Sequence, residues 1–218
     1  MIKKPTNEKM QEVYYSNLRV EMARFVPQEC QRILDVGCSE GHFGELLKKN
    51  RKAEVWGVEL SAEAGAVAAT RLDKVITGDF TAILAQLPSN YFDCLVFNDV
   101  LEHFTHPDDI LARCVSLLSP GGYIISSIPN VRYIGNLVEV LIHKDWEYKS
   151  GGILDRTHYR FFTRKSIIRM FSGAGFEVLL CTGINPTHSF KTWLLGLITL
   201  GHMADVKYLE FATVAKLI

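Results

Sequence analysis

The sequence lacks the features that mark several large classes of protein. Its 24 basic and 24 acidic residues cancel, so it has none of the basic excess that general nucleic-acid binders carry. It has five cysteines and no C-x-x-C pair. This odd, scattered set argues against a disulfide framework and against a zinc site, and we expect a reducing, cytoplasmic environment.

Long hydrophobic runs are also missing. The longest late apolar stretch, residues 193–200, is far too short to cross a bilayer. The basic start at Lys3 and Lys4 is followed by no apolar run of the secretory kind. We therefore expect neither a membrane span nor a secretory signal. The chain of 218 residues is 48% hydrophobic, which is enough for one packed domain and too apolar for a disordered chain.

Short apolar segments alternate with amphipathic ones over the first 130 residues. This rhythm predicts a parallel sheet with helices on both faces, an α/β fold. After Pro129 the rhythm changes, and we expect an insertion over about 130–162 and a variable segment over about 186–206 of a single domain. Strands are predicted near 31–36, 54–59, 74–77, 92–97, 121–128, 176–181 and 211–217. Helices are predicted near 8–26, 41–50, 62–71, 80–86, 107–118, 131–142 and from Thr163 to the glycines at 173–175.

A glycine turn follows the first predicted strand, in the stretch 33–44. Gly37 and Gly41 allow the backbone to turn sharply and to approach a ligand closely. Glu59 ends the second predicted strand and offers two acceptor oxygens to the hydroxyls of a ribose. The pattern therefore predicts a site for a ribose-bearing cofactor.

The details of this turn argue against a nicotinamide dinucleotide. Such sites use G-x-G-x-x-G at a helix start to hold a pyrophosphate, whereas Gly37 to Gly41 is G-x-x-x-G. Asp35 lies just before the turn, where its charge would repel a pyrophosphate and attract a cationic group.

With Asp35-x-Gly37-x-x-x-Gly41, the chain resembles the class I S-adenosylmethionine-dependent methyltransferases. The order of later motifs agrees: Gly78-Asp79-Phe80, the strand at 92–97, Asn98-Asp99-Val100-Leu101-Glu102-His103 and Pro120-Gly121-Gly122. The resemblance covers about residues 30–130, and Ser39 stands where the family usually has a glycine. It implies a Rossmann-like fold, with a seven-stranded, mostly parallel sheet and an antiparallel strand pair at its edge.

The resemblance also assigns roles to cofactor-binding residues. Asp35 and the backbone at Gly37, Cys38 and Gly41 would face the methionine part of S-adenosylmethionine. Glu59 would hold the ribose, and Leu60 would flank the adenine. The remaining roles fall to Asp79 at the adenine amino group, Phe80 against the ring and Asn98 near the sulfonium. The residues leave other readings open, because Asp79 is also a good helix cap, Phe80 a good core residue and Asn98 an ordinary strand-end residue.

Two histidines are candidates for the base that an oxygen acceptor would need. His103 follows the strand at 92–97, and His158 is preferred because it lies among the polar and aromatic side chains of 154–163. That segment resembles an Asp-Arg-Thr-His-x-Arg-Phe-Phe-Thr signature of methyltransferases associated with glycan modification. Alternatively, Asp155 and Arg156 pair and the phenylalanines pack a helix. No histidine spacing of the H-x-x-x-H kind is present, so no metal is expected.

These features favour methyl transfer to a small molecule or glycan, with a sugar or nucleotide-sugar hydroxyl as the expected acceptor. An RNA or protein methyltransferase and a non-catalytic protein that binds S-adenosylmethionine remain the alternatives. Residues 131–149 and 186–206 would shape the acceptor pocket, and the second segment is either a flap or a surface for a homodimer. No nucleic-acid partner is expected.

Overall fold

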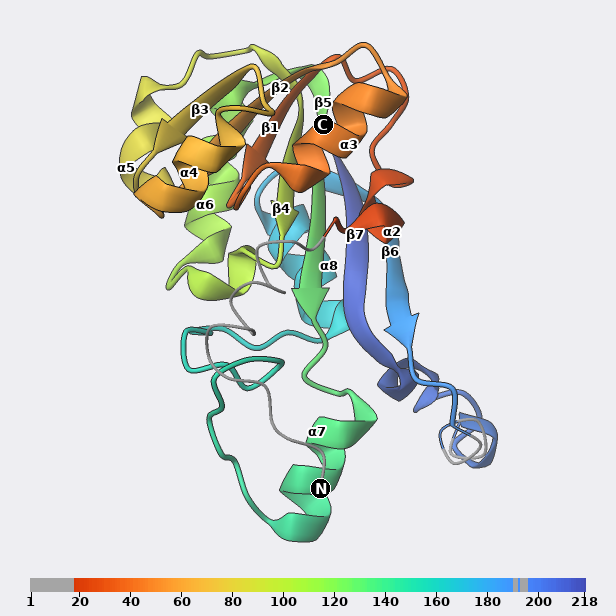
Figure 1. Cartoon of the computed structure of the whole chain (residues 1–218). Coiled ribbons are helices and arrows are strands. Elements are labelled where there is room, and N and C mark those ends of the chain that lie inside the picture. The colour runs from red at the N-terminus through yellow and green to blue at the C-terminus, as the bar shows by residue number, and fades with distance from the viewer. Residues whose placement is uncertain (1–17, 190–191, 193–195) are drawn as a thin grey trace. The chain divides into compact units, whose positions relative to one another are not determined.

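The computed structural model describes residues 18–189, 192 and 196–218. These residues form two compact units: the first ends at Val96 and includes Ser116–Gly122, and the second comprises Phe97–Val115 and Tyr123–Ile218. The strands form a seven-stranded sheet in the order β3-β2-β1-β4-β5-β7-β6 (Figure 1). Every strand predicted from the sequence is present, and the Rossmann-like α/β fold is confirmed.

The first unit is built on parallel strands. They are β1 (Arg32–Val36), β2 (Glu54–Glu59) and β3 (Lys74–Thr77). β4 (Phe92–Asn98) follows, and its residues up to Val96 belong to this unit. β1 pairs in parallel with β2, and β2 with β3, so Asp35 lies opposite Gly57 and Glu59 opposite Thr77. The carboxyl ends of these strands therefore carry the acidic residues of the predicted cofactor site.

The helices of the first unit follow each strand. α3 (His42–Asn50) and α4 (Ala62–Ala68) contact β2 and lie on the same face of the strands (Figure 1). α5 (Phe80–Ile83) and the 3-10 turn η1 (Leu84–Gln86) follow β3. Of the helix predicted over 8–26, residues 8–17 lie outside the described residues. The described part contains only a four-residue helix, α2 (Val20–Ala23).

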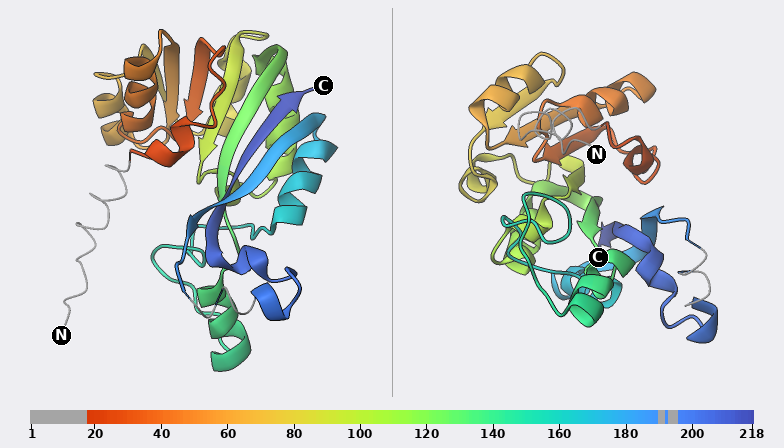
Figure 2. Two further views of the ribbon diagram at one scale, coloured as in Figure 1. Left: turned by 90° about the vertical axis from the view of Figure 1, so that its right-hand side faces the viewer. Right: turned by 60° about the horizontal axis from the view of Figure 1, so that its bottom comes forward.

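The second unit contains the long antiparallel strands. β5 (Leu118–Pro129) pairs with β7 (Tyr208–Leu217), and β7 pairs with β6 (Phe176–Pro186), both in antiparallel fashion. The hairpin of β6 and β7 lies at the edge of the sheet, as predicted, and Figure 2 shows the two strands side by side. Within the hairpin, β7 is buried over Glu210–Ala215, whereas β6 alternates between buried and exposed residues.

Helices cover this hairpin and the end of β4. The turn η2 (Leu101–His103), α6 (Pro107–Cys114) and the turn η3 (Val115–Leu117) follow β4. α8 (Arg164–Gly173) packs on β6 and contacts α6. Thr163 caps α8 as predicted, because its side chain accepts from the Ser166 N–H and the Ser166 side chain accepts in return from the Thr163 N–H.

The helix predicted over 131–142 is shorter than expected. α7 spans Ile134–Val138 and continues into a π-helical turn, η4 (Glu139–His143), beyond the end of β5 (Figure 1). The start at 131 was wrong because Asn130 forms a turn, in which its side chain accepts from the Arg132 N–H at 3.0 Å. A last 3-10 turn, η5 (Ala204–Lys207), leads into β7. Within the described ranges, no helix has both the length and the apolar character needed to cross a membrane.

Candidate functional site

The turn after β1 has the left-handed backbone that its glycines allow. Gly37 has φ 70° and Gly41 has φ 80°, a region where a Cβ is unfavourable. Ser39 lies in the same region, with φ 53°, which explains why a glycine would be the easier residue there. The turn is fixed to β2, because Gly37 N–H and Cys38 N–H both donate to the Val58 carbonyl, at 2.8 and 3.1 Å.

The Glu59 carboxylate is held by two backbone groups at the end of β2. Its Oε2 accepts from Ser39 N–H at 2.8 Å, and its Oε1 accepts from Ser61 N–H at 2.9 Å. A carboxylate has about four acceptor positions, so each oxygen keeps capacity for a further donor. Glu59 is thus oriented by the glycine turn on one side and by the start of α4 on the other, which suits a residue that receives two neighbouring hydroxyls.

Asp35 is a buried carboxyl group next to this turn. It is 2% exposed, and its Oδ2 has no hydrogen-bond partner among the described residues. Burial, with a smaller contribution from the charge of Glu59, raises the pKa of the Asp35 carboxyl to about 8. A cation placed against Asp35 would favour the ionised carboxylate and would supply the charge partner that this buried group needs.

This raised pKa predicts how the stability of the protein without ligand depends on pH. Asp35 binds a proton more tightly in the folded chain, with a pKa of about 8 against a reference value of 3.8. Its contribution to stability is therefore complete below the lower value and is lost as pH rises towards the upper one. We expect the unfolding free energy of the wild type to fall by up to about 1.4 kcal/mol per pH unit between these limits.

Denaturant unfolding across this pH range, compared with Asp35→Asn, would check the expectation. The asparagine amide has a similar shape but does not titrate. The unfolding free energy of Asp35→Asn should therefore lack the part of the pH dependence that comes from Asp35. Equal slopes for the wild type and Asp35→Asn would show that Asp35 is ionised in the folded protein.

In the second unit, β4 ends at Asn98, whose buried Oδ1 has no hydrogen-bond partner among the described residues. Asp99 follows with a left-handed φ of 55°. Ser127, on β5, holds this unusual backbone: its hydroxyl donates to Asp99 Oδ1 at 2.8 Å, and Asp99 N–H donates to the Ser127 oxygens. Strained residues of this kind are common where a fold positions a ligand.

Beyond Asp99, a carboxylate and two imidazoles gather in a cluster of Glu102, His103 and His158. Glu102 is 1% exposed, and its Oε1 lies 4.0 Å from Nε2 of His158. The rings of His103 and His158 meet edge to face, with their centroids 4.7 Å apart. Burial, then the neighbouring charge of His158, lowers the pKa of His103. The cluster joins both histidines that were predicted as bases.

The backbone of the 153–160 segment holds this cluster together. Tyr159 N–H and Arg160 N–H donate to the Glu102 carbonyl, at 2.9 and 3.2 Å. The Arg160 side chain also donates to the Thr105 carbonyl at 2.8 Å. Asp155 bonds to Thr157, whose N–H and hydroxyl both donate to its Oδ1. The signature segment is therefore attached to the residues that follow β4 at Tyr159 and Arg160.

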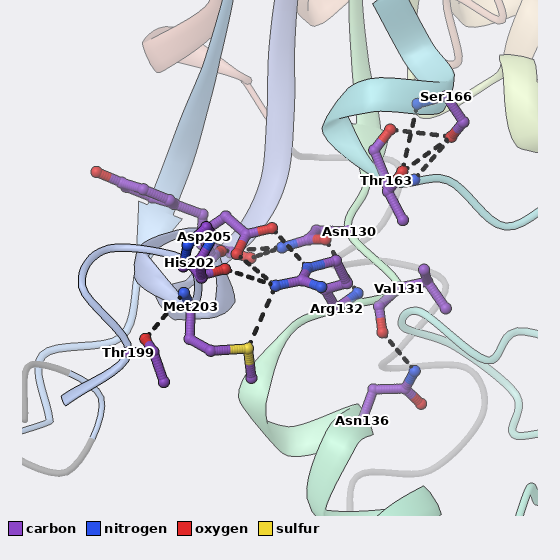
Figure 3. Close-up of polar contacts among 11 residues, drawn as sticks. Asn130, Val131, Arg132, Asn136, Thr163, Ser166, Thr199, His202, Met203 and Asp205 are labelled. Atoms are coloured by element: carbon purple, nitrogen blue, oxygen red, sulfur yellow. Dashed lines mark hydrogen bonds and ion pairs between the residues drawn. The ribbon is translucent and has the colours of Figure 1, made fainter. Parts of the chain in front are cut away.

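The start of the insertion is tied to the variable segment by Arg132. Its guanidinium forms a two-point ion pair with Asp205, with Nε–Oδ2 2.8 Å and Nη2–Oδ1 3.0 Å (Figure 3). Nη2 also donates to the His202 carbonyl at 3.0 Å, and the Asn130 side chain donates to the Asp205 carbonyl at 3.1 Å. Two segments that were predicted to shape the acceptor pocket are thus directly connected.

Removal of the Arg132 guanidinium should have a modest effect on stability. The two side chains are 35% and 26% exposed, and pairs of this kind contribute about 1 kcal/mol or less. We expect Arg132→Ala to lower the unfolding free energy by about 1 kcal/mol, measured by urea denaturation. Arg132→Lys keeps the charge but loses the two-point geometry, so it should recover only part of the loss. Full recovery of the unfolding free energy in Arg132→Lys would show that the two-point geometry of the guanidinium does not contribute to stability.

Comparisons with known proteins assign the chain to a family. The family model for a methyltransferase domain matches residues 7–180. The chain belongs to the methyltransferase-domain family. This family uses S-adenosylmethionine, which confirms the predicted cofactor.

Curated relatives of the chain include two ubiquinone biosynthesis O-methyltransferases. That of Burkholderia multivorans is 39% identical over 148 residues, covering 65% of this chain and 62% of the relative. That of Burkholderia thailandensis is 30% identical over 186 residues, covering 82% and 76%. The matched region thus spans less than two thirds of the first of these relatives.

A solved structure shows the same fold. The S-adenosylmethionine-dependent methyltransferase from Archaeoglobus fulgidus superposes with a TM-score of 0.69 at 20% identity, and the match covers 97% of this chain and all of that one. At this level of identity the likeness establishes the fold.

Some of the predicted cofactor residues have a structural role in the chain. A Cβ at Gly41 would lie 3.1 Å from Ala68 Cα, so this glycine is also needed where the turn meets α4. The Cys38 side chain is buried, 5% exposed, and its backbone bonds within the turn: its N–H donates to the Val58 carbonyl, and its carbonyl accepts from Gly41 N–H at 2.8 Å. Phe80 is equally buried at 5% exposure, as in the core reading of that residue. Leu60 is 73% exposed and is open to a ring.

Asp79 caps a helix, which was the alternative interpretation of its position. Its Oδ1 accepts from Thr81 N–H at 2.6 Å at the start of α5. Capping uses one oxygen of the exposed carboxylate, so the predicted adenine contact stays a prediction. The residues that the sequence reasoning missed are Glu102 and Ser127. The position of Glu102 next to His103 could have indicated its role. No pattern in the sequence indicated Ser127, which lies inside an apolar strand.

Proposed function

We propose that the chain transfers a methyl group from S-adenosylmethionine to a hydroxyl oxygen of a small molecule. The observation that supports S-adenosylmethionine as the methyl donor is the presence of both Asp35 and Glu59 at the turn after β1. A buried carboxyl with an unpartnered Oδ2 among the described residues fits a cationic amino-acid group, and the oriented Glu59 carboxylate fits ribose hydroxyls. S-adenosylmethionine carries both of these chemical groups.

The acceptor half of the proposal rests on the cluster of Glu102, His103 and His158. An oxygen nucleophile must lose its proton during the transfer, so a basic group has to lie within reach. The His158 Nδ1 faces the Ile153 carbonyl at 3.0 Å. A carbonyl only accepts, so this bond makes Nδ1 the donor, and in the neutral ring Nε2 then carries the lone pair. The names of the two Burkholderia relatives, both O-methyltransferases, support oxygen as the acceptor atom.

Among hydroxyl groups, a phenolic acceptor has the best support. A phenol has a pKa of about 10, as in tyrosine, whereas an alcohol is closer to water, at about 15.7. An imidazole base with an ordinary pKa of about 6.5 is better matched to the phenol. The ubiquinone pathway in the relatives' names points the same way. A sugar hydroxyl is the second candidate, favoured by the signature at 155–163 with its exposed Arg156 and Arg160.

Methyl transfer from labelled S-adenosylmethionine to a panel of acceptors would test the proposal. The panel contains catechols and quinol-like phenols, nucleotide sugars, glycan fragments and bulk RNA. We expect label in the phenols, with formation of S-adenosylhomocysteine in equal amount. Label in nucleotide sugars alone would select the second candidate. Label in RNA, or cofactor binding without transfer to any acceptor class, would contradict the proposal in favour of a nucleic-acid enzyme or a non-catalytic binding protein.

A further inference from the structure

The cluster of Glu102, His103 and His158 has the composition of a metal site. The three side chains each offer one ligand atom, and these atoms all lie within 4.8 Å of one another. The side chain of Glu102 is 1% exposed and that of His158 is 8% exposed, so the ligands are held largely away from water. Two imidazoles and one carboxylate form a common ligand set for divalent transition metals.

The backbone fixes both imidazoles in the tautomer that a metal requires. Nδ1 of His158 donates to the Ile153 carbonyl at 3.0 Å, and Nδ1 of His103 donates to the Thr157 carbonyl at 3.2 Å. In the neutral form of each ring, this bond places the proton on Nδ1 and the lone pair on Nε2. Histidines that bind metals usually donate their other N–H to a carbonyl or carboxylate in this way, because the bond orients the ring and strengthens the ligand.

We propose that Glu102, His103 and His158 bind one divalent transition-metal ion. The ion would be of the Zn²⁺, Fe²⁺, Co²⁺ or Mn²⁺ type, because imidazole ligands favour these ions over Mg²⁺ and Ca²⁺. Metal–ligand bonds of about 2.0–2.2 Å place neighbouring ligand atoms about 3.0–3.5 Å apart. The ligand atoms lie within 4.8 Å of one another, 4.0 Å apart for Glu102 Oε1 and His158 Nε2, so their separations have to shorten by up to about 1.8 Å, which side-chain rotation can supply.

The pattern of the sequence did not reveal this site. His103 and His158 are far apart in the chain, so they lack the short spacing by which metal sites are recognised, and no metal was expected. The bonds from Tyr159 N–H and Arg160 N–H to the Glu102 carbonyl bring the two segments together. Among the described residues, no other group of three such side chains was found within this distance.

The catalytic meaning of the metal rests on the proposed function. Three protein ligands leave at least one position open on a four- to six-coordinate ion. An acceptor hydroxyl bound there would have a lower pKa, as metal-bound water has. The hydroxyl proton would leave to solvent, and an oxygen lone pair would form the bond to the methyl carbon. The electron pair of the carbon–sulfur bond would stay on sulfur, giving the neutral thioether.

Cobalt binding to the tag-free protein, without cofactor or acceptor, would test the site. After treatment with a chelator, Co²⁺ is added, and the visible d–d absorption of the bound ion is followed. We expect saturation at one equivalent and loss of the signal when Zn²⁺ competes. His103→Ala, His158→Ala and Glu102→Gln should each weaken binding by about 100-fold or more, since even changes to groups behind the ligands cost 10- to 100-fold.

His106→Ala is the matched control, because His106 is exposed and precedes α6 only a few residues after His103. It should bind Co²⁺ as the wild type does. Wild-type protein that binds no Co²⁺ at one equivalent, or unchanged binding in both His103→Ala and His158→Ala, would overturn the proposal. The wild-type titration needs no variant to fold. Because it contains no substrate, its result is independent of whether methyl transfer to phenols is observed.

Discussion

Glu59→Ala should lower the affinity for S-adenosylmethionine by about 100-fold or more. In the proposed complex, the Glu59 carboxylate accepts from two ribose hydroxyls, and hydrogen bonds to a charged group contribute about 1.5–3 kcal/mol each. Loss of both amounts to about 3 kcal/mol at the lower limit, which corresponds to roughly 100-fold in affinity. Isothermal titration calorimetry with S-adenosylmethionine measures this directly.

A control is needed because Glu59 also supports the turn. The variant leaves Ser39 N–H and Ser61 N–H without their acceptor, so part of the loss would come from a less ordered loop. Thermal unfolding of Glu59→Ala and Glu59→Gln separates the two effects, since glutamine keeps one acceptor oxygen and the shape. Glu63→Ala, in the first turn of α4 and exposed, should bind as the wild type does. Binding within threefold of the wild type in Glu59→Ala would contradict the ribose role.

The strands and the capped helices were predictable because their signals are local. β1, β2 and β4 are apolar runs that end at Val36, Glu59 and Asn98, within one residue of the predicted ends. α8 begins after the Thr163 cap and ends at Gly173, as expected from its flanking residues. Such features depend on side chains a few positions apart, which a sequence displays directly.

The insertion was predicted less well because its conformation depends on distant partners. The Asn130 turn that delays α7 is held by bonds to the Asp205 and Tyr208 carbonyls, some 75 residues later in the chain. Arg132 finds Asp205 across a similar separation. No periodicity or composition within 130–142 carries this information, so local patterns extended the helix too far towards its start.

The candidate site likewise contains residues that were predictable from the sequence and residues that were not. Glu59 and the left-handed turn were predicted because a carboxylate at a strand end and glycines with positive φ are visible in the sequence. The burial of Glu102 beside His158 was not predicted, because it arises where two segments distant in the sequence meet. For Asp79 and Phe80 the sequence left two roles open. An aspartate can bind a ligand or cap a helix, and a phenylalanine can contact a ring or fill the core. In the structure Asp79 caps α5 and Phe80 is buried.

His158→Ala should lower turnover by about 10²- to 10⁴-fold, the range that a positioned acid or base contributes. The imidazole either takes the acceptor proton or holds the ion that lowers the hydroxyl pKa, so both roles predict a loss in kcat. The affinity for S-adenosylmethionine should change little, because the proposed contacts to the cofactor are made by Asp35 and Glu59 and not by His158. Steady-state kinetics with the phenolic acceptor, together with calorimetry for the cofactor, measure the two quantities separately.

The pH profile then distinguishes the chemistry from simple unfolding. His158→Ala lacks an activating group, so its residual rate should rise with pH as the acceptor ionises in solution, and the difference from the wild type should narrow towards the phenol pKa of about 10. His143→Ala, at the exposed end of η4, is the matched control and should keep full turnover. Wild-type turnover in His158→Ala would remove this residue from the mechanism. A deficit that stays constant at all pH values would assign it a purely structural role in holding the 153–160 segment.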